Sequence, residues 1–304
     1  MRIISLLPSA TEIIYNIGLQ DKLAGRSHEC DYPPEVENIP ACSSPGEDQV
    51  SAKNFRDAGP GELIESVLSP HHVDAEKIKS LEPTHIITQS MCDKCAVTPR
   101  QLNDALEDFL QKSGVKIIDL NTIDLNSVYG SIYKLSSELG AETAGRRLVS
   151  DMQSEFYKIA GLAGRTDNKP RTAVIEWIDP LMAAGHWTAE MVSIAGAEDA
   201  FAGKNAQWLV TDALKKADPE IIIFAPCAYT INDTLKEIHK LTDQDFWHDL
   251  TAVKKENVFI ADGSAYFNRP GPRLADTLRI MAEIIHPGIF EKSFSEKDYV
   301  QFKS

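Results

Sequence analysis

The sequence feature that most constrains the fold is a helical periodicity with no strand inside it, running from Leu125 to Ala163. Apolar residues recur along one face of this segment, at Leu125, Val128, Ile132, Leu135, Leu139, Leu148, Met152, Phe156 and Ile159. At 1.5 Å per residue, a single helix over this segment is about 55 Å long, which exceeds the width of one small domain. The pattern predicts one long helix that packs along two lobes and leaves a ligand cleft between them. Gly140 and Gly145 count against an unbroken rod.

Strand and helix patterns alternate on both sides of this segment. A buried strand at residues 2–7 precedes a helix at 10–17, for which Ser9 and Glu12 predict a capping box. The second half repeats the alternation, with strands expected at 172–177, 220–225 and 257–261. Such alternation predicts an α/β fold of two Rossmann-like lobes with parallel-type sheets. We place an N-terminal lobe at 1–122, the bridging helix at 123–164 and a C-terminal lobe at 165–304.

Charge and hydropathy exclude several classes of partner. The 304 residues carry a formal net charge of −14, which disfavours a nucleic-acid or anionic-membrane surface. No apolar stretch reaches the ~18 residues of a membrane span, and the apolar run before Glu12 is too short for a signal peptide. We expect a monomer that is not inserted in a membrane. It is cytoplasmic as the sequence stands, or periplasmic or extracellular if a leader was removed.

The residues that follow the predicted strands are rich in aromatic and soft-ligand side chains. Ligands bind open parallel sheets outside the carboxyl ends of the strands, where loops and helix N-termini converge. The candidate ligand contacts at these positions are Ser9, His28, Cys30, Tyr32, Cys92, Trp177, His186, Trp187, Tyr266, Phe267, Asn268 and Arg269. This composition suits a large, flat or metal-bearing organic ligand, because aromatic side chains combine a large contact area with a polar tip.

Cysteine spacing raises the question of a metal. Cys92 and Cys95 form half of a zinc-ribbon pattern or a thiol-redox pair, and the sequence holds no second pair. Together with His28 and Cys30 they give four possible soft ligands for a metal ion. The alternatives are loop packing and reversible oxidation of the two cysteines. His71 and His72 follow Pro70, and we expect them to cap a helix end or to face solvent.

Three segments and the bridging helix carry a resemblance to a known family. The segments are residues 2–13, the Cys30-Asp31-Tyr32-Pro33-Pro34 loop, and residues 266–272, which read Tyr-Phe-Asn-Arg-Pro-Gly-Pro. Over essentially the whole chain the sequence resembles the cobalamin and iron-chelate substrate-binding proteins of ABC importers, and most of all the cobalamin-binding members. The resemblance implies two α/β lobes joined by one long helix. It also implies a cleft that captures the ligand with little movement, and delivery of that ligand to a membrane permease.

The functional prediction is non-enzymatic binding of a cobalamin-like corrinoid. No nucleophile–base set, phosphate-binding loop or dinucleotide fingerprint is evident, so we predict no catalytic residues and no required cofactor. Two alternatives stay open. The first is an iron-siderophore or haem ligand in the same fold. The second is a cytosolic thiol- or metal-dependent enzyme that uses Cys30, Cys92 and Cys95. The expected partners are a metal-organic small molecule and an ABC permease.

Overall fold

The computed structural model describes residues 1–45, 71–91, 96–201 and 206–303. The chain divides into two compact units. Unit 1 consists of residues 1–122 and 126–149, and unit 2 consists of residues 123–125 and 150–304. Because the division falls after Val149, helix α6 (Glu142–Ala163) contributes to both units.

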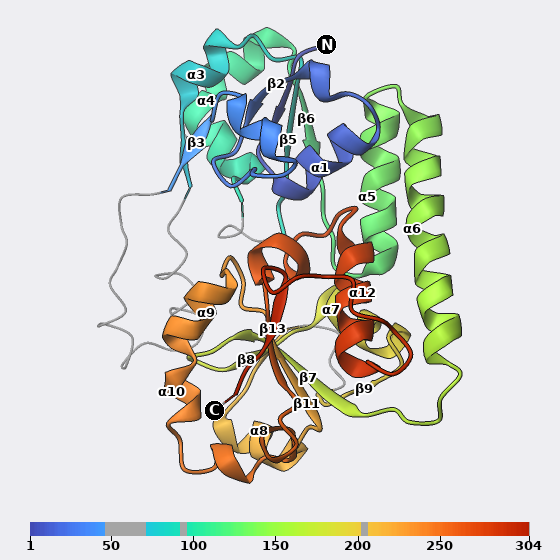
Figure 1. Cartoon of the computed structure of the whole chain (residues 1–304). Coiled ribbons are helices and arrows are strands. Elements are labelled where there is room, and N and C mark those ends of the chain that lie inside the picture. The colour runs from blue at the N-terminus through green and yellow to red at the C-terminus, as the bar shows by residue number, and fades with distance from the viewer. Residues whose placement is uncertain (46–70, 92–95, 202–205, 304) are drawn as a thin grey trace. The chain divides into compact units, whose positions relative to one another are not determined.

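Unit 1 is built on a four-stranded parallel sheet in the order β2-β1-β5-β6 (Figure 1). The strands are β1 (Ile3–Ser5), β2 (Leu23–Arg26), β5 (His85–Thr88) and β6 (Lys116–Asp119). The main helices are α1 (Pro8–Asn16), α3 (Ala75–Ser80), α4 (Pro99–Ser113) and α5 (Leu125–Glu138), with short 3₁₀ turns at Gln20–Lys22 and Pro34–Asn38. A two-residue antiparallel pair, β3 (Ser43–Ser44) and β4 (His72–Val73), lies beside them. The apolar core of the unit includes Ile4, Ile86 and Leu102.

Helix α1 begins earlier than its sequence suggests. Its N-cap is Leu7, without a side-chain cap, and Pro8 stands in the first turn. Proline suits this position because its fixed φ matches the helix and its missing N–H has no partner there in any case. The predicted Ser9–Glu12 capping box is therefore wrong. Ser9 lies inside the first turn and is buried.

The segment from Leu125 to Ala163 forms two helices instead of one. Helix α5 ends at Glu138, α6 begins at Glu142, and the two lie side by side in Figure 1. Gly140 takes a φ of 70° between them, and the N–H groups of Gly140 and Ala141 donate to the carbonyl oxygens of Ser137 and Ser136. This arrangement is a Schellman C-cap, which ends a helix and favours glycine at its left-handed position. The predicted single rod is thus wrong at Gly140. The predicted apolar stripe is buried along both helices except at Leu148, which is half-buried.

Unit 2 contains a seven-stranded mixed sheet. The path runs β10-β8-β7-β11-β12-β13, and β9 pairs with β7. The strands are β7 (Arg171–Trp177), β8 (Met182–Ala183), β9 (Glu198–Asp199), β10 (Gln207–Trp208), β11 (Ile221–Phe224), β12 (Val258–Ala261) and β13 (Tyr299–Gln301). The central strands β7, β11 and β12 are parallel as predicted, whereas β8, β10 and β13 run antiparallel to their neighbours. The α/β class is confirmed.

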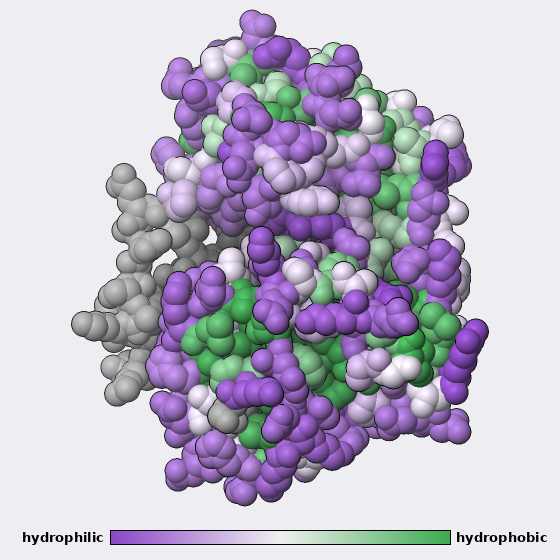
Figure 2. All heavy atoms as spheres, viewed as in Figure 1, coloured by the Kyte–Doolittle hydropathy of each residue, from purple (hydrophilic) through white to green (hydrophobic). Residues whose placement is uncertain are grey.

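Short helices cover the sheet of unit 2. They are α7 (His186–Ile194), α8 (Thr211–Ala217), α9 (Ile231–Glu237), α10 (His239–Thr242), α11 (Thr251–Lys254) and α12 (Leu274–Ile285), with a 3₁₀ turn at Trp247–Asp249 and a π-helical turn, η5, at Gly263–Phe267. The core includes Ile175, Phe224 and Trp247, whose ring lies 6.2 Å from that of Phe224. Figure 2 shows a largely hydrophilic face, on which hydrophobic residues gather over unit 2. None of the described helices has the length and apolar character needed to cross a membrane.

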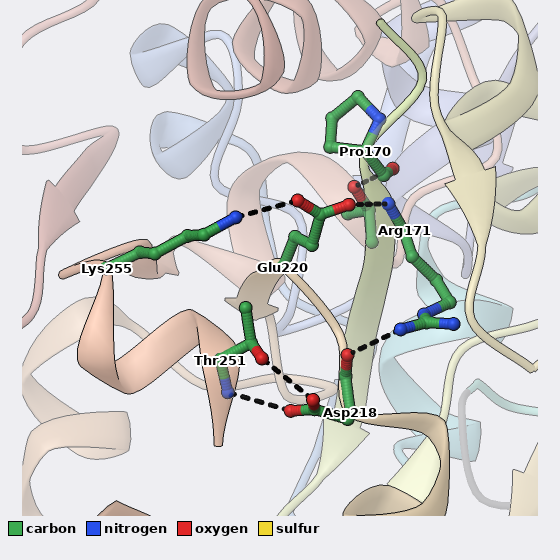
Figure 3. A network of polar contacts seen from close by, with 7 residues as sticks. Pro170, Arg171, Asp218, Glu220, Thr251 and Lys255 are labelled. Atoms are coloured by element: carbon green, nitrogen blue, oxygen red, sulfur yellow. Dashed lines mark hydrogen bonds and ion pairs between the residues drawn. The ribbon is translucent and has the colours of Figure 1, made fainter. Parts of the chain in front are cut away.

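A polar network closes the amino-terminal edge of the central strands in unit 2 (Figure 3). The backbone N–H and the hydroxyl of Thr251 both donate to the carboxylate of Asp218, each at 2.7 Å. The Lys255 ammonium lies 2.9 Å from the Glu220 carboxylate, and an Arg171 guanidinium nitrogen donates to the Asp218 carbonyl oxygen at 3.0 Å. Because these contacts occupy one edge of the sheet, the loops at the opposite, carboxyl edge are the place to look for a ligand site.

Candidate functional site

The carboxyl ends of β7, β11 and β12 form the edge at which the aromatic candidates of unit 2 gather. The three strands are parallel neighbours and end at Trp177, Phe224 and Ala261. The loops that follow them therefore emerge at the same edge. We call this the strand-end surface of unit 2, defined by Trp177, His186, Trp187, Tyr229 and residues 263–269.

Trp177 and Tyr229 form a half-buried aromatic pair on this surface. Their ring centroids are 5.3 Å apart and the planes are tilted by 57°. The indole Nε1–H of Trp177 donates to the Asp179 carbonyl oxygen at 3.1 Å, which fixes the ring orientation. Burial raises the pKa of the Tyr229 hydroxyl, and the Glu237 and Asp233 carboxylates add to that increase, so the phenol stays neutral. The pair offers a preorganised aromatic contact with remaining exposed area.

His186 combines strain with an unused ring atom. It is the first residue of α7 and has a φ of 52°, a region that non-glycine residues occupy at a cost. Its ring stacks on that of Trp187, with centroids 5.8 Å apart. The Nδ1 atom is buried and has no hydrogen-bond partner among the described residues. Strained residues of this kind cluster at functional sites, which makes His186 a strong candidate for contact with a ligand.

Several contacts within unit 2 hold the loop after β12. The Asn268 side-chain amide donates to the carbonyl oxygens of Ala225 and Gly263, at 3.2 and 3.0 Å. Trp187, Phe267 and Arg269 are buried, with 6%, 2% and 7% of their surface exposed. The Tyr266 hydroxyl donates to Asp298 Oδ1 at 2.6 Å, and burial together with this contact raises the pKa of Tyr266. These side chains shape the surface, and their predicted contact with ligand stays a prediction.

Glu176 was missed by the sequence analysis and stands next to Trp177 in β7. Burial raises the pKa of its carboxyl to about 7, although a hydrogen bond from the Gly185 backbone acts in the opposite direction. The group therefore titrates near neutral pH beside the strand-end surface. The strand pattern shows only a polar residue at this position, so no sequence signal distinguishes it from a solvated glutamate.

In unit 1 the predicted ligand contacts differ in how exposed their side chains are. Cys30 is buried, and its sulfur accepts a hydrogen bond from the Thr11 hydroxyl at 3.1 Å. Tyr32 is 43% exposed. Ser9 is buried in the first turn of α1. Cys92 and Cys95 lie outside the described residues, so the predicted four-ligand metal site with His28 and Cys30 stays a prediction.

His28 lies close to His71 and to the Ser43 hydroxyl in unit 1. The two imidazole centroids are 5.3 Å apart, and His28 Nδ1 lies 2.9 Å from the Ser43 hydroxyl. Burial, the His71 ring and the Arg26 guanidinium lower the pKa of His28 to about 4. His28 is therefore a neutral imidazole at physiological pH. His71 is 8% exposed, so the expectation that it faces solvent is wrong, whereas His72 is exposed as expected. The alternative that the two histidines cap a helix end stays a prediction.

Comparison with known proteins identifies the family of this chain. Residues 3–265 match the family described as periplasmic binding protein. The chain belongs to this family. Its members bind solutes and are not enzymes, so the predictions of a substrate-binding protein of the ABC-importer type and of no catalytic activity are confirmed. The α/β lobes resemble those of solved members.

Individual relatives resemble the chain along most of its length. An uncharacterized ABC transporter substrate-binding lipoprotein of Bacillus subtilis, YvrC, is 27% identical over 96% of this chain and 82% of its own. The vitamin B12-binding protein of Vibrio cholerae is 25% identical over 91% of this chain and 86% of its own. Among solved structures, the apo periplasmic heme-binding protein RhuT of Roseiflexus superposes with a TM-score of 0.70 at 21% identity, covering 95% of this chain and 98% of that one.

Proposed function

We propose that this substrate-binding protein captures a cobalt corrinoid and presents it to an ABC permease. The observation that carries the proposal is the full-length similarity to vitamin B12-binding proteins, combined with the aromatic strand-end surface of unit 2. A corrin ring is broad and largely apolar on its faces, and aromatic side chains supply area and van der Waals contact for such a ligand.

Some residues in this proposal contact the ligand directly, and others hold the contacting residues in place. Trp177 and Tyr229 provide a half-buried aromatic pair, and His186 provides a nitrogen with no described partner. Trp187, Phe267 and Asn268 hold these groups in place through buried contacts. The residues assigned in unit 1, which are Ser9, His28, Cys30 and Tyr32, are kept as proposed contacts.

A second candidate ligand is haem. The specific support is the backbone similarity to heme-binding proteins, whose named member RhuT superposes with a TM-score of 0.70. At 21% identity this similarity concerns the fold, so the corrinoid, which is supported by curated relatives, is the first choice.

Location follows from the same relatives. The family is described as periplasmic, and the Bacillus relative is named a lipoprotein. We propose that the mature protein works outside the cytoplasmic membrane, which is where an importer needs its binding protein. The alternative of a cytoplasmic protein predicts that fractionation of the native host finds the chain with soluble cytoplasmic markers.

Binding is tested by mixing the purified chain separately with cyanocobalamin and with hemin, followed by desalting and isothermal titration calorimetry. Retained red corrinoid absorbance at one equivalent supports the proposal. Retention of hemin alone moves the assignment to haem, and retention of neither overturns both.

Site placement is tested with variants at the aromatic pair. Truncating a desolvated aromatic anchor typically costs 2 kcal/mol or more, about thirtyfold in affinity, and we expect this for Trp177→Ala. Tyr157→Ala is the matched control, because Tyr157 is 75% exposed on α6. Equal affinities of the two variants would place the ligand elsewhere.

A further inference from the structure

Three side chains of unit 1 converge, and only His28 among them is also a proposed contact of the corrinoid. One possible ligand atom each from His28, Glu29 and His71 lies within 4.8 Å of the other two. His71 is buried, and the other two residues are half-buried. Among the described residues no other group of three or more histidine, cysteine or acidic side chains converges in this way.

Local structure holds the first two of these residues in place. A tight turn joins Ser27 to Cys30 through a backbone hydrogen bond of 3.1 Å. The Arg26 guanidinium donates to the carbonyl oxygens of Ser27, His28 and Ile39, so its charge is tied to the backbone of the loop. His28 and Glu29 are therefore presented by a loop whose course is fixed on both sides.

Strand pairing brings in the third residue from far along the sequence. β3 pairs with β4, with Ser43 opposite Val73 and Ser44 opposite His72, and His71 directly precedes β4. Ser43 also accepts a hydrogen bond from the His28 backbone N–H at 3.2 Å. The β3–β4 pair thus connects the loop of His28 to His71.

Ser43 also orients the His28 ring. Its hydroxyl lies 2.9 Å from His28 Nδ1 and 3.1 Å from the hydroxyl of Ser27. An Nδ1–H that donates to Ser43 leaves the Nε2 lone pair free. A hydrogen bond from the remote ring nitrogen is the common way in which proteins fix the tautomer of a metal-binding histidine.

We propose that His28, Glu29 and His71 bind a single divalent transition-metal ion of the zinc type. Two imidazoles and a carboxylate suit Zn²⁺, Co²⁺ or Ni²⁺ better than Ca²⁺ or Mg²⁺, which prefer oxygen ligands only. Ligand atoms on one tetrahedral zinc lie about 3.3 Å apart for bonds of about 2.05 Å. The three ligand atoms already lie within 4.8 Å of one another, so side-chain adjustments bring them to this separation.

The electrostatics of the site are compatible with a bound cation. The Glu29 carboxylate offsets part of the ion's charge. Three protein ligands leave a fourth position for water or an added ligand. The site shares only His28 with the four-ligand set expected from the sequence.

The experiment uses the full chain stripped with a chelator and desalted, without corrinoid or haem. Zn²⁺ is titrated in competition with a chromogenic chelator, and Co²⁺ absorbance reports the ligand geometry. We expect one equivalent of Zn²⁺ per chain. Loss of an outer-shell partner of a metal commonly costs about 10–100-fold in affinity, so Ser43→Ala should weaken Zn²⁺ binding by about tenfold. His71→Ala and Glu29→Gln each remove a direct ligand, so each should weaken Zn²⁺ binding by at least about tenfold.

His72→Ala is the matched control, since His72 is exposed and adjacent in sequence. It should bind Zn²⁺ like the unsubstituted chain. Circular dichroism checks that each variant is folded, and His28→Gln replaces His71→Ala if the latter unfolds. Absence of stoichiometric Zn²⁺ binding, equal loss in His72→Ala, or unchanged affinity in the folded ligand variants overturns the proposal. Because no corrinoid is present, this outcome is independent of the proposed transport function.

Discussion

Trp187 donates its indole Nε1–H to the carbonyl oxygen of Phe267 at 3.0 Å, which joins the first turn of α7 to the π-helical turn after β12. Both side chains are buried. The contact fixes His186, which precedes Trp187, relative to the loop of residues 263–269. Trp187 is therefore a buried, structural member of the strand-end surface of unit 2, whereas half-buried Trp177 contributes the exposed part of its ring.

The first prediction concerns the stability contributed by Trp187. Trp187→Ala should lower the free energy of unfolding by about 3–5 kcal/mol, because it leaves a large cavity. Trp187→Phe keeps most of the ring but leaves the buried Phe267 carbonyl without its donor, at a cost of about 1–3 kcal/mol. Urea unfolding measures both. Tyr157→Ala, at an exposed position, should stay within about 0.5 kcal/mol of the unsubstituted chain. A Trp187→Ala variant as stable as this control would contradict the supporting role.

Sequence periodicity predicted much of the fold because its physical causes are local. The parallel strands β7, β11 and β12 are short apolar runs, and the buried stripe of α5 and α6 repeats with helical spacing. The sequence raised Gly140 and Gly145 equally as weak points of the rod, because a glycine inside a helix and a glycine after its C-cap look the same in a sequence. Only Gly140 ends a helix, and Gly145 lies inside α6. The Schellman hydrogen bonds that separate the two cases form only in three dimensions.

The candidate sites were less predictable, because they depend on contacts between distant segments. His71 meets His28 only through the pairing of β3 with β4, and sequence spacing carries no trace of it. The altered pKa of Glu176 arises from burial, which an isolated polar residue in a strand does not reveal. By contrast, Trp177 and His186 were proposed from the rule that ligands bind at the carboxyl ends of parallel strands, and their contact with a ligand stays a prediction.

A second prediction tests the close packing of α5 on α6. A Cβ atom at Gly145 would lie 2.0 Å from Ser136 Oγ and 2.4 Å from its Cβ, whereas a Cβ at Gly161 meets nothing within 4 Å. Gly145→Ala should therefore destabilise the chain by about 1–3 kcal/mol through overpacking. Gly161→Ala, in the same helix, should stabilise it by about 0.4–1 kcal/mol. Thermal and urea unfolding of both variants checks the difference, and effects of the same sign would contradict it.

A third prediction follows from the lowered pKa of His28. The folded chain holds this pKa at about 4, against an ordinary value of 6.5. Between these values the unfolded chain binds more protons, so the His28 contribution is fully present above pH 6.5 and is lost as pH falls towards 4. The free energy of unfolding should therefore drop less on acidification in His28→Gln than in the unsubstituted chain. Urea unfolding at pH 7.5 and 5.0 without added metal measures this, and parallel decreases would show that His28 is not buried in a neutral form.

The last prediction has the opposite sign and concerns Glu176. Burial raises the pKa of this carboxyl from 4.5 to about 7, so the folded chain binds more protons than the unfolded chain between these values. The resulting contribution is fully present below pH 4.5 and is lost as pH rises through 7. A shift of this size sets an upper limit of about 3–4 kcal/mol at 1.36 kcal/mol per pH unit, and the partial solvent exposure of Glu176 lowers the expected value below it. Glu176→Gln keeps the shape of the neutral acid and removes the titration. Its free energy of unfolding, relative to that of the unsubstituted chain, should therefore be higher at pH 8 than at pH 5. A stability difference independent of pH would show that the Glu176 carboxylate is well solvated. Asp179→Asn controls for a simple change of net charge, because Asp179 is exposed and lies two residues past the end of β7.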